Sequence, residues 1–356
     1  MTTSSNGFKA VLIGIGAMAF GACTSQSGDS AAPTVEAAAS AGGAYEVPRT
    51  SWGDPDLQGI WPGTAMVGVP MQRDEKLGAR NWLTEEEFQA REVQFAKQSE
   101  QDNADFDLSN AKETPGGDVG GPVSPPPHWL ERGKPQYQAS LIVDPPNGRM
   151  PPMTGTAQDR QAALRKARDG RGPADSYTDR SLYDRCITRA LVGSLTPAIY
   201  NAGNEIVQSP GYVVIRNEMI HEARVVPLDS EPHVGGDIKE WLGDSRGHWD
   251  GDTLVVETTN FTDRTNVGQA RHSDALKVTE RYTRVDADTL ELKITIEDPV
   301  TWTAPWTLSL PLKRDDGYGM YEYACHEGNL AMFNILSGAR ADERAAAGKA
   351  VAGKAR

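Results

Sequence analysis

The stretch LKVTERYTRVDADTLELKITIE, residues 276–297, decides the fold. In its second half, every other residue is apolar and shares one face: Leu290, Leu292, Ile294 and Ile296. In its first half, one face carries Leu276, Val278, Glu280 and Tyr282. Asp286-Ala287-Asp288 separates the halves as a turn signal. This period of two predicts a pair of antiparallel strands, each buried on one side.

Similar runs extend outward from this pair. Strands are expected over 205–208, 212–216, 220–228, 253–261, 276–285, 289–297, 306–313 and 320–325. Turn signals such as Pro210-Gly211 and Asp315-Asp316-Gly317 separate them, and no helical pattern intervenes. The segment 244–252 is expected to be a turn around Gly247 and Gly251, because its acids do not have the spacing of an EF-hand calcium loop. The sequence therefore predicts a mainly β fold, an antiparallel meander that closes into a barrel.

The N-terminal half lacks this alternating strand pattern. An excursion over 62–190 is rich in helices and loops, with helices predicted at 84–97, where Thr84 and Glu87 form a capping box, at 156–168 and at 181–188. A short strand is expected at 140–144. We predict one domain over 48–338, followed by a polar, Ala-rich tail over 339–356 that forms a solvated helix or a frayed end.

The N-terminus resembles a bacterial lipoprotein signal. Lys9 precedes an apolar run over 10–20, and small residues lead to Cys23. We expect 1–22 to be a signal peptide, Cys23 to carry lipid, and 23–47 to be a flexible tether. An ordinary cleaved signal or an unprocessed amphipathic N-terminus are the alternatives. The resemblance places the protein in the periplasm, on the outer membrane because no Asp follows Cys23.

The charge balance bears on the partners. The formal net charge is −13, and removal of residues 1–22, which contain Lys9 and no acid, makes it −14. Such a chain is a poor partner for nucleic acid, and we expect contact with the membrane only through the lipid anchor. The six histidines show no zinc-site spacing, and no phosphate loop, dinucleotide fingerprint or Gly-x-Ser-x-Gly elbow occurs. We therefore predict no metal and no cofactor.

Two cysteines, Cys186 and Cys325, remain after Cys23 is assigned to lipid. In the oxidising periplasm they are expected to form a disulfide. A reactive thiol beside His326 and two free buried thiols are the alternatives.

Glu280 is the first candidate catalytic residue, because a carboxylate on an apolar strand face must be paired, hydrogen-bonded or protonated. His221 is the second, since Met219, Ala223 and Val225 share its face. If both point into one cavity, they form an acid–base pair. The alternatives are an internal salt bridge from Glu280 to Arg224 or Arg284, and a satisfied core histidine.

A second cluster of titratable residues, 321–329, contains His326 and Glu327 as further catalytic candidates, or else forms a strand end and a helix cap. The expected lining of an apolar, aromatic cavity is Tyr212, Arg224, Tyr282, Trp302, Trp306 and Tyr323. Two functions follow: a cofactor-independent lyase, isomerase or hydrolase for a small apolar or aromatic molecule, or a non-catalytic ligand-binding or envelope lipoprotein.

Two resemblances bear on this interpretation. Gly59-Ile60-Trp61 resembles the Gly-x-Trp signature of lipocalin-like (calycin) barrels, which implies a lipocalin-like closure. More broadly, the chain resembles a family of secreted bacterial proteins. The motifs that carry this resemblance are PDLxGxW at 55–61, SLIVDPP at 140–146, GDSRG at 243–247, GDTLVV at 251–256, ERYTR at 280–284 and ACHEGN at 324–329. This resemblance implies a single integrated domain and leaves the chemistry open.

Overall fold

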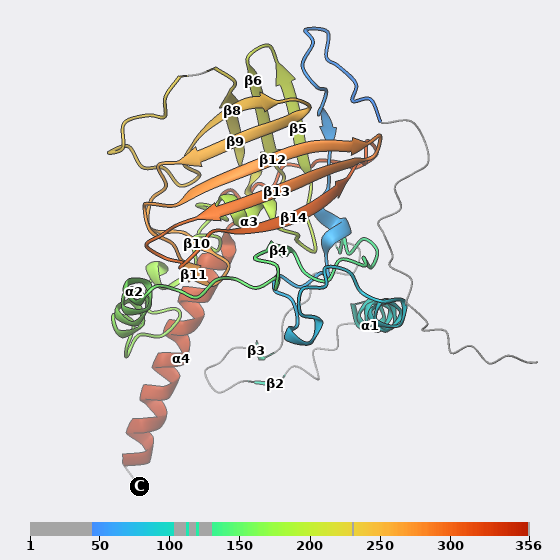
Figure 1. The fold of residues 1–356 in the computed structure, drawn as a ribbon. Helices are drawn as coiled ribbons and strands as arrows, with labels where there is room; N and C mark the ends of the chain where they lie inside the picture. The colour runs from blue at the N-terminus through green and yellow to red at the C-terminus, as the bar shows by residue number, and fades with distance from the viewer. Residues whose placement is uncertain (1–44, 103–111, 114–118, 121–129, 230, 355–356) are drawn as a thin grey trace, which may run out of the picture. The chain divides into compact units, whose positions relative to one another are not determined.

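The protein is described by a computed structural model, which covers residues 45–102, 112–113, 119–120, 130–229 and 231–354 (Figure 1). The predicted signal peptide, Cys23 and the tether as far as residue 44 lie outside these residues.

The larger sheet contains six strands, all antiparallel to their neighbours. In spatial order they are β4 (Ile142–Asp144), β14 (Trp306–Lys313), β13 (Thr289–Glu297), β12 (Lys277–Asp286), β9 (Thr253–Thr259) and β8 (Asp244–Asp250). The β12–β13 pair is the stretch over residues 276–297, and its register places Glu280 opposite Ile294 and Tyr282 opposite Leu292.

The smaller sheet contains four antiparallel strands: β1 (Gly59–Ile60), β5 (Asn204–Ser209), β6 (Tyr212–Asn217) and β7 (Ala223–Pro227). Its strands run steeply across those of the larger sheet (Figure 1), as in orthogonal sheet packing. The prediction of a mainly β, antiparallel fold is confirmed. Among the described residues no ladder joins the two sheets, so the closed barrel is not found.

The core consists of the inward faces of the strands. The predicted alternation is confirmed, since the four apolar residues from Leu290 to Ile296 on β13 are fully buried. On β14 Trp306, Leu308 and Leu310 are also fully buried. Trp61 follows β1 into this core and donates a hydrogen bond from its indole nitrogen to the carbonyl of Leu57.

The two sheets approach closely where β8 passes β7. A Cβ atom on Gly247 would lie 2.7 Å from Leu228 and 2.8 Å from Val226. Only glycine fits between the strands at this point, and Gly247 therefore lies inside β8 rather than at a turn. The turn predicted over 244–252 begins only at Gly251, which has φ of +61°.

Among the described residues, four α-helices lie outside the sheets: α1 (Glu85–Asp102), α2 (Gly155–Lys166), α3 (Leu191–Leu195) and α4 (Leu330–Lys354). The same residues also form short 3₁₀ helices, η1 (Gly63–Met66), η2 (Glu75–Leu77), η5 (Tyr177–Asp179) and η6 (Met219–His221). Two small ladders pair β2 (Lys112–Glu113) with β3 (Val119–Gly120) and β10 (Asn266–Val267) with β11 (Ala270–Arg271).

The predicted capping box of α1 is present. The Thr84 hydroxyl accepts from the amide of Glu87 at 3.3 Å, and the amide of Thr84 donates to the Glu87 carboxylate at 2.9 Å.

Two further predicted elements are wrong. Residues 320–325 form no strand, because β13 and β4 already occupy both edges of β14. Residues 181–188 form turns instead of a helix, since Cys186 adopts φ of +56°, which interrupts a helical path.

Candidate functional site

Glu280 lies at the centre of a buried polar network. Arg224 donates two hydrogen bonds to its carboxylate, at 2.7 and 2.8 Å, and the Tyr282 hydroxyl donates a third at 3.0 Å. Glu280 is fully buried and Arg224 is 6% exposed. Burial alone would lower the pKa of Arg224, but the charge of Glu280 raises it above its ordinary value. This geometry matches the salt-bridge alternative for Glu280.

His221 lies elsewhere, on the exposed side of the chain. Its Nδ1 atom is 2.7 Å from the carbonyl oxygen of Tyr323. Among the described residues His221 and Glu280 do not interact, and each has its own partners. The expected apolar face around His221 is wrong, because Val225 is 60% exposed while Arg224 is buried. Ile220 and His221 both have positive φ, and after this bend Arg224 points inward, where Glu280 neutralises it.

The remaining predicted residues are dispersed. Trp302 and Trp306 pack edge to face in the core, with ring centroids 5.6 Å apart, whereas Tyr212 is exposed. Trp302 borders a cavity of about 380 Å³. His326 and Glu327 are exposed before α4, where the Asn329 side chain accepts a hydrogen bond from the amide of Met332, so the helix-cap alternative describes this cluster.

The two core-domain cysteines form the expected disulfide. Cys186 and Cys325 are bonded, with Cα atoms 5.6 Å apart. Neither is a free thiol, and the bond ties the segment around residue 186 to the segment before α4.

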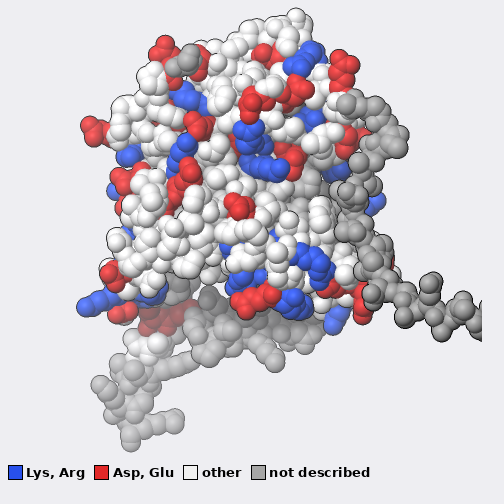
Figure 2. All heavy atoms as spheres, in the orientation of Figure 1, with Lys and Arg blue, Asp and Glu red and all other residues white. Residues whose placement is uncertain are grey.

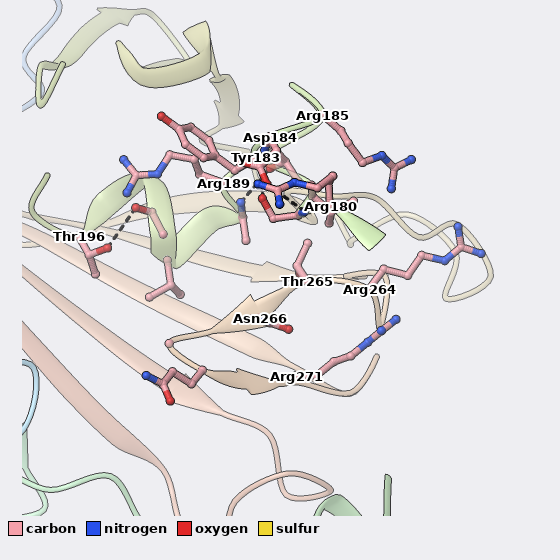
Figure 3. A pocket seen from close by; sticks show the side chains of 18 of the residues that line it. Arg180, Tyr183, Asp184, Arg185, Arg189, Thr196, Arg264, Thr265, Asn266 and Arg271 are labelled. Carbon is pink, nitrogen blue, oxygen red and sulfur yellow. Dashed lines mark hydrogen bonds and ion pairs between the residues drawn. The ribbon is translucent and has the colours of Figure 1, made fainter. Parts of the chain in front are cut away.

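A larger cavity, of about 1180 Å³, lies against this disulfide-bonded segment (Figure 3). Three pieces of chain form its walls: part of α2, most of the segment 178–200, and residues 264–271 with the β10–β11 hairpin. Met71 and Met219 add apolar surface. The segments are distant in sequence, so only the fold assembles this cavity.

Arginine dominates the charge of the cavity. Its lining includes seven arginines, two aspartates and no lysine. Arg180 pairs with Asp184 at 3.2 Å. Six others form no ion pair with any residue that the structure describes: Arg165, Arg168, Arg185, Arg189, Arg264 and Arg271. Asp179 is bound by Arg171, whose hydrogen bond lowers the pKa of Asp179. Among the described residues, most of this excess positive charge therefore has no acidic side chain within ion-pair distance.

Weak contacts hold several of these guanidinium groups in place. Arg185 lies over the ring of Tyr177, 5.2 Å from its centroid, and Arg189 lies over Tyr183 at 5.6 Å. The Arg271 Nε atom donates to the carbonyl of Asp263 at 2.6 Å. In Figure 3 the ends of Arg185, Arg264 and Arg271 lie on the same side of the view, although they come from different segments.

Tyrosine hydroxyls brace the wall behind Arg189. The Tyr183 hydroxyl lies 3.0 Å from that of Tyr200, 3.2 Å from that of Tyr323 and 3.3 Å from the sulfur of Met219. Burial, followed by these hydrogen bonds, raises the pKa of Tyr183. The hydroxyl therefore stays neutral and acts as a structural hydrogen-bond group beside the cavity.

Sequence reasoning missed the arginine-lined cavity. A signal was present: within residues 160–189 this acidic chain carries seven arginines, at 160, 165, 168, 171, 180, 185 and 189. The helices and loops predicted over this segment leave its arginines without a role. The sequence gives no comparable signal for Arg264 and Arg271, because only folding brings them close to the arginines of residues 160–189.

Surface charge elsewhere is mixed. On the face shown in Figure 2, acidic and basic side chains are interspersed.

Within the described parts of the chain, no three His, Cys, Asp or Glu side chains come together in a way that would hold a metal ion. No helix among the described residues is long and apolar enough to cross a membrane.

Comparison with known proteins adds no identity. No family model matches the chain, and neither a curated protein nor a solved structure matches it.

Proposed function

We propose that this protein is a non-catalytic binding protein for a small molecule with several oxyanion groups, held in the arginine-lined cavity. Six cavity arginines form no ion pair within the described part of the chain, although the net charge is −13, and this observation carries the proposal. Arg165, Arg168 and Arg264 are exposed and the other three are half-buried, so water screens part of their mutual repulsion. An anionic ligand bound between them would relieve the rest.

The residue type favours oxyanions. A guanidinium group presents its donors in a planar fork that matches a carboxylate, phosphate or sulfate, whereas an ammonium group is a point charge. The cavity contains arginine and no lysine. This choice favours ligands with planar or tetrahedral oxygen groups over simple anions such as chloride.

The size and distribution of the arginines favour more than one anionic group. A cavity of about 1180 Å³ has room for a molecule much larger than a single phosphate. The arginines come from α2, from 178–200 and from the hairpin, so one small ion has too few atoms to reach them all. The ring of Tyr183, which lies beside Arg189 and lines the cavity, supplies an apolar contribution.

We still expect a periplasmic location with a lipid anchor at Cys23. Closure of the two sheets into a lipocalin-like barrel is still a prediction, and ligand binding in the cavity does not require it. Acid–base chemistry by Glu280 and His221 is left out, since each has its own partners.

Calorimetric titration of the full chain in detergent tests the proposal. Pyrophosphate and citrate serve as oxyanion probes, and maltose is the neutral control. We expect binding of at least one oxyanion, weakened by salt as screening predicts. Arg185→Gln and Arg264→Gln should each weaken it about tenfold, the effect of losing one charge-assisted hydrogen bond.

Arg344→Gln is the matched control, because Arg344 is exposed on α4 and does not line the cavity. It should leave the affinity unchanged. Equal losses in all three variants, or binding of maltose alone, would contradict the proposal.

A further inference from the structure

The β10–β11 hairpin carries the arginines of one cavity wall. Its ladder pairs Asn266 with Arg271 and Val267 with Ala270, and it belongs to neither large sheet. Arg264 precedes β10, and Arg271 ends β11. A two-stranded ladder is marginally stable by itself, so other contacts must hold these two arginines in position.

A buried side-chain contact closes the base of the hairpin. Thr265 and His272 are the next residues outward from the Asn266–Arg271 pair, and the Thr265 Oγ1 atom lies 2.5 Å from the His272 Nε2 atom. Their exposed fractions are 3% and 1%. The contact therefore joins the two chain ends of the hairpin away from water.

The protonation of His272 follows from its partners. Its Nδ1 atom lies 2.7 Å from the carbonyl oxygen of Ser273, which can only accept a hydrogen bond. Nδ1 thus carries the proton, and Nε2 accepts from the Thr265 hydroxyl. Burial lowers the pKa of His272, which favours this neutral form.

Hydrogen bonds to residues outside the hairpin also hold its C-terminal end in place. The amide and hydroxyl of Ser273 both donate to the carboxylate of Asp298, each at 2.7 Å. Arg160 donates to the carbonyl of Arg271 at 2.7 Å and to the Thr301 hydroxyl at 2.9 Å. His272, Ser273 and Asp298 do not line the large cavity.

We infer that His272 is a positioning residue for oxyanion recognition: through its hydrogen bond with Thr265 it fixes the hairpin, and with it Arg264 and Arg271, against the cavity. The inference rests on the proposed function. It adds a histidine that does not line the cavity, at one step from Thr265, which does, and it gives a role to the buried polar chain that runs from Asp298 to Thr265.

A pair of nearly isosteric variants separates the hydrogen bond from packing. Thr265→Val removes the hydroxyl, whereas Thr265→Ser keeps it. With the full chain and the oxyanion that the wild type binds, pyrophosphate or citrate, we expect Thr265→Val to weaken affinity about tenfold. Thr265→Ser should restore most of it, and His272→Leu should resemble Thr265→Val.

A double-mutant cycle shows whether the effect acts through the hairpin arginines. In the Arg264→Gln/Arg271→Gln background, Thr265→Val should cause no further loss of affinity. Since Thr265 also lines the cavity, an equal loss in both backgrounds would mean either a direct contact of its hydroxyl with the ligand or a general effect on the fold, and either would overturn the inference.

Amide hydrogen exchange of residues 266–271 gives a readout without ligand. Thr265→Val should speed exchange there relative to Thr265→Ser, with α2 unchanged. Unchanged exchange in the hairpin overturns the positioning role even where the wild type binds pyrophosphate or citrate. If the wild type binds no anion at all, the proposed function is overturned. Faster amide exchange of the hairpin in Thr265→Val would then mean that the hydrogen bond between Thr265 and His272 has only a structural role.

Discussion

Arg224 on β7 and Glu280 on β12 form a bidentate ion pair that joins the two sheets inside the core. The two nitrogen–oxygen distances are 2.7 and 2.8 Å, and Glu280 has no exposed surface. A charged pair in this position must be complete, because removal of one partner leaves the other buried and unpaired.

Glu280→Gln should therefore lower the free energy of unfolding by about 3–5 kcal/mol, the usual cost of breaking a buried ion pair on one side. Urea unfolding measures the change. Glu291→Gln is the control on the same sheet, since its pair with Lys293 is partly exposed and is expected to contribute about 0–1 kcal/mol. Anion affinity should not change in the folded Glu280→Gln protein. A stable variant with altered turnover or binding would return Glu280 to the functional residues.

The disulfide should stabilise both the domain and the cavity wall. Cys186→Ser/Cys325→Ser removes a bond between residues 139 apart in sequence, and we expect a loss of about 2–5 kcal/mol in unfolding free energy. Because Cys186 lies within the wall segment 178–200, oxyanion affinity should fall as well. Mass mapping without reduction should find the Cys186–Cys325 peptide, and two free thiols on the unfolded protein would contradict the bond.

His272 should make the stability sensitive to mild acid. Burial lowers its pKa in the folded protein, so the unfolded chain binds a proton first as the pH falls below about 6.5. Stability should then decline from about pH 6.5 down to the lowered pKa of the folded state. Asp298 and the cations Arg160 and Arg271 are the charged groups that face it.

His272→Gln removes this titration and should flatten the profile of unfolding free energy between pH 6.5 and 5. Thermal unfolding across that range provides the measurement, with His221→Gln as the control because His221 is exposed. Identical slopes in the wild type and His272→Gln would show that His272 does not titrate differently on folding.

Membrane attachment depends on Cys23 if the N-terminus is a lipoprotein signal. Cys23→Ser should move the protein from the membrane fraction to the soluble fraction and abolish incorporation of labelled palmitate. The Cys186→Ser/Cys325→Ser variant, which keeps Cys23, should stay in the membrane fraction. Retention of Cys23→Ser in the membrane would rule out the lipid anchor.

Local patterns were enough for much of the fold. The alternation in 276–297 determined two central strands and their buried faces, because a period of two acts within a single strand and needs no knowledge of distant partners. The same holds for the capping box at Thr84 and Glu87, whose contacts span three residues. The disulfide also followed from the count of cysteines and the expected compartment.

Only the tertiary structure decided which face of β7 points inward. Val225 has the apolar side chain, yet Arg224 is buried, since Glu280, 56 residues away in sequence, neutralises it. The cavity is the same kind of case. Arginines from 165–189 and from 264–271 line one cavity only because the fold brings the two segments together. We infer that the hydrogen bond between His272 and Thr265 holds the β10–β11 hairpin in that position. Sequence alone determined periodic burial, which is local, whereas charge pairing and the cavity depend on distances between segments that only folding brings together.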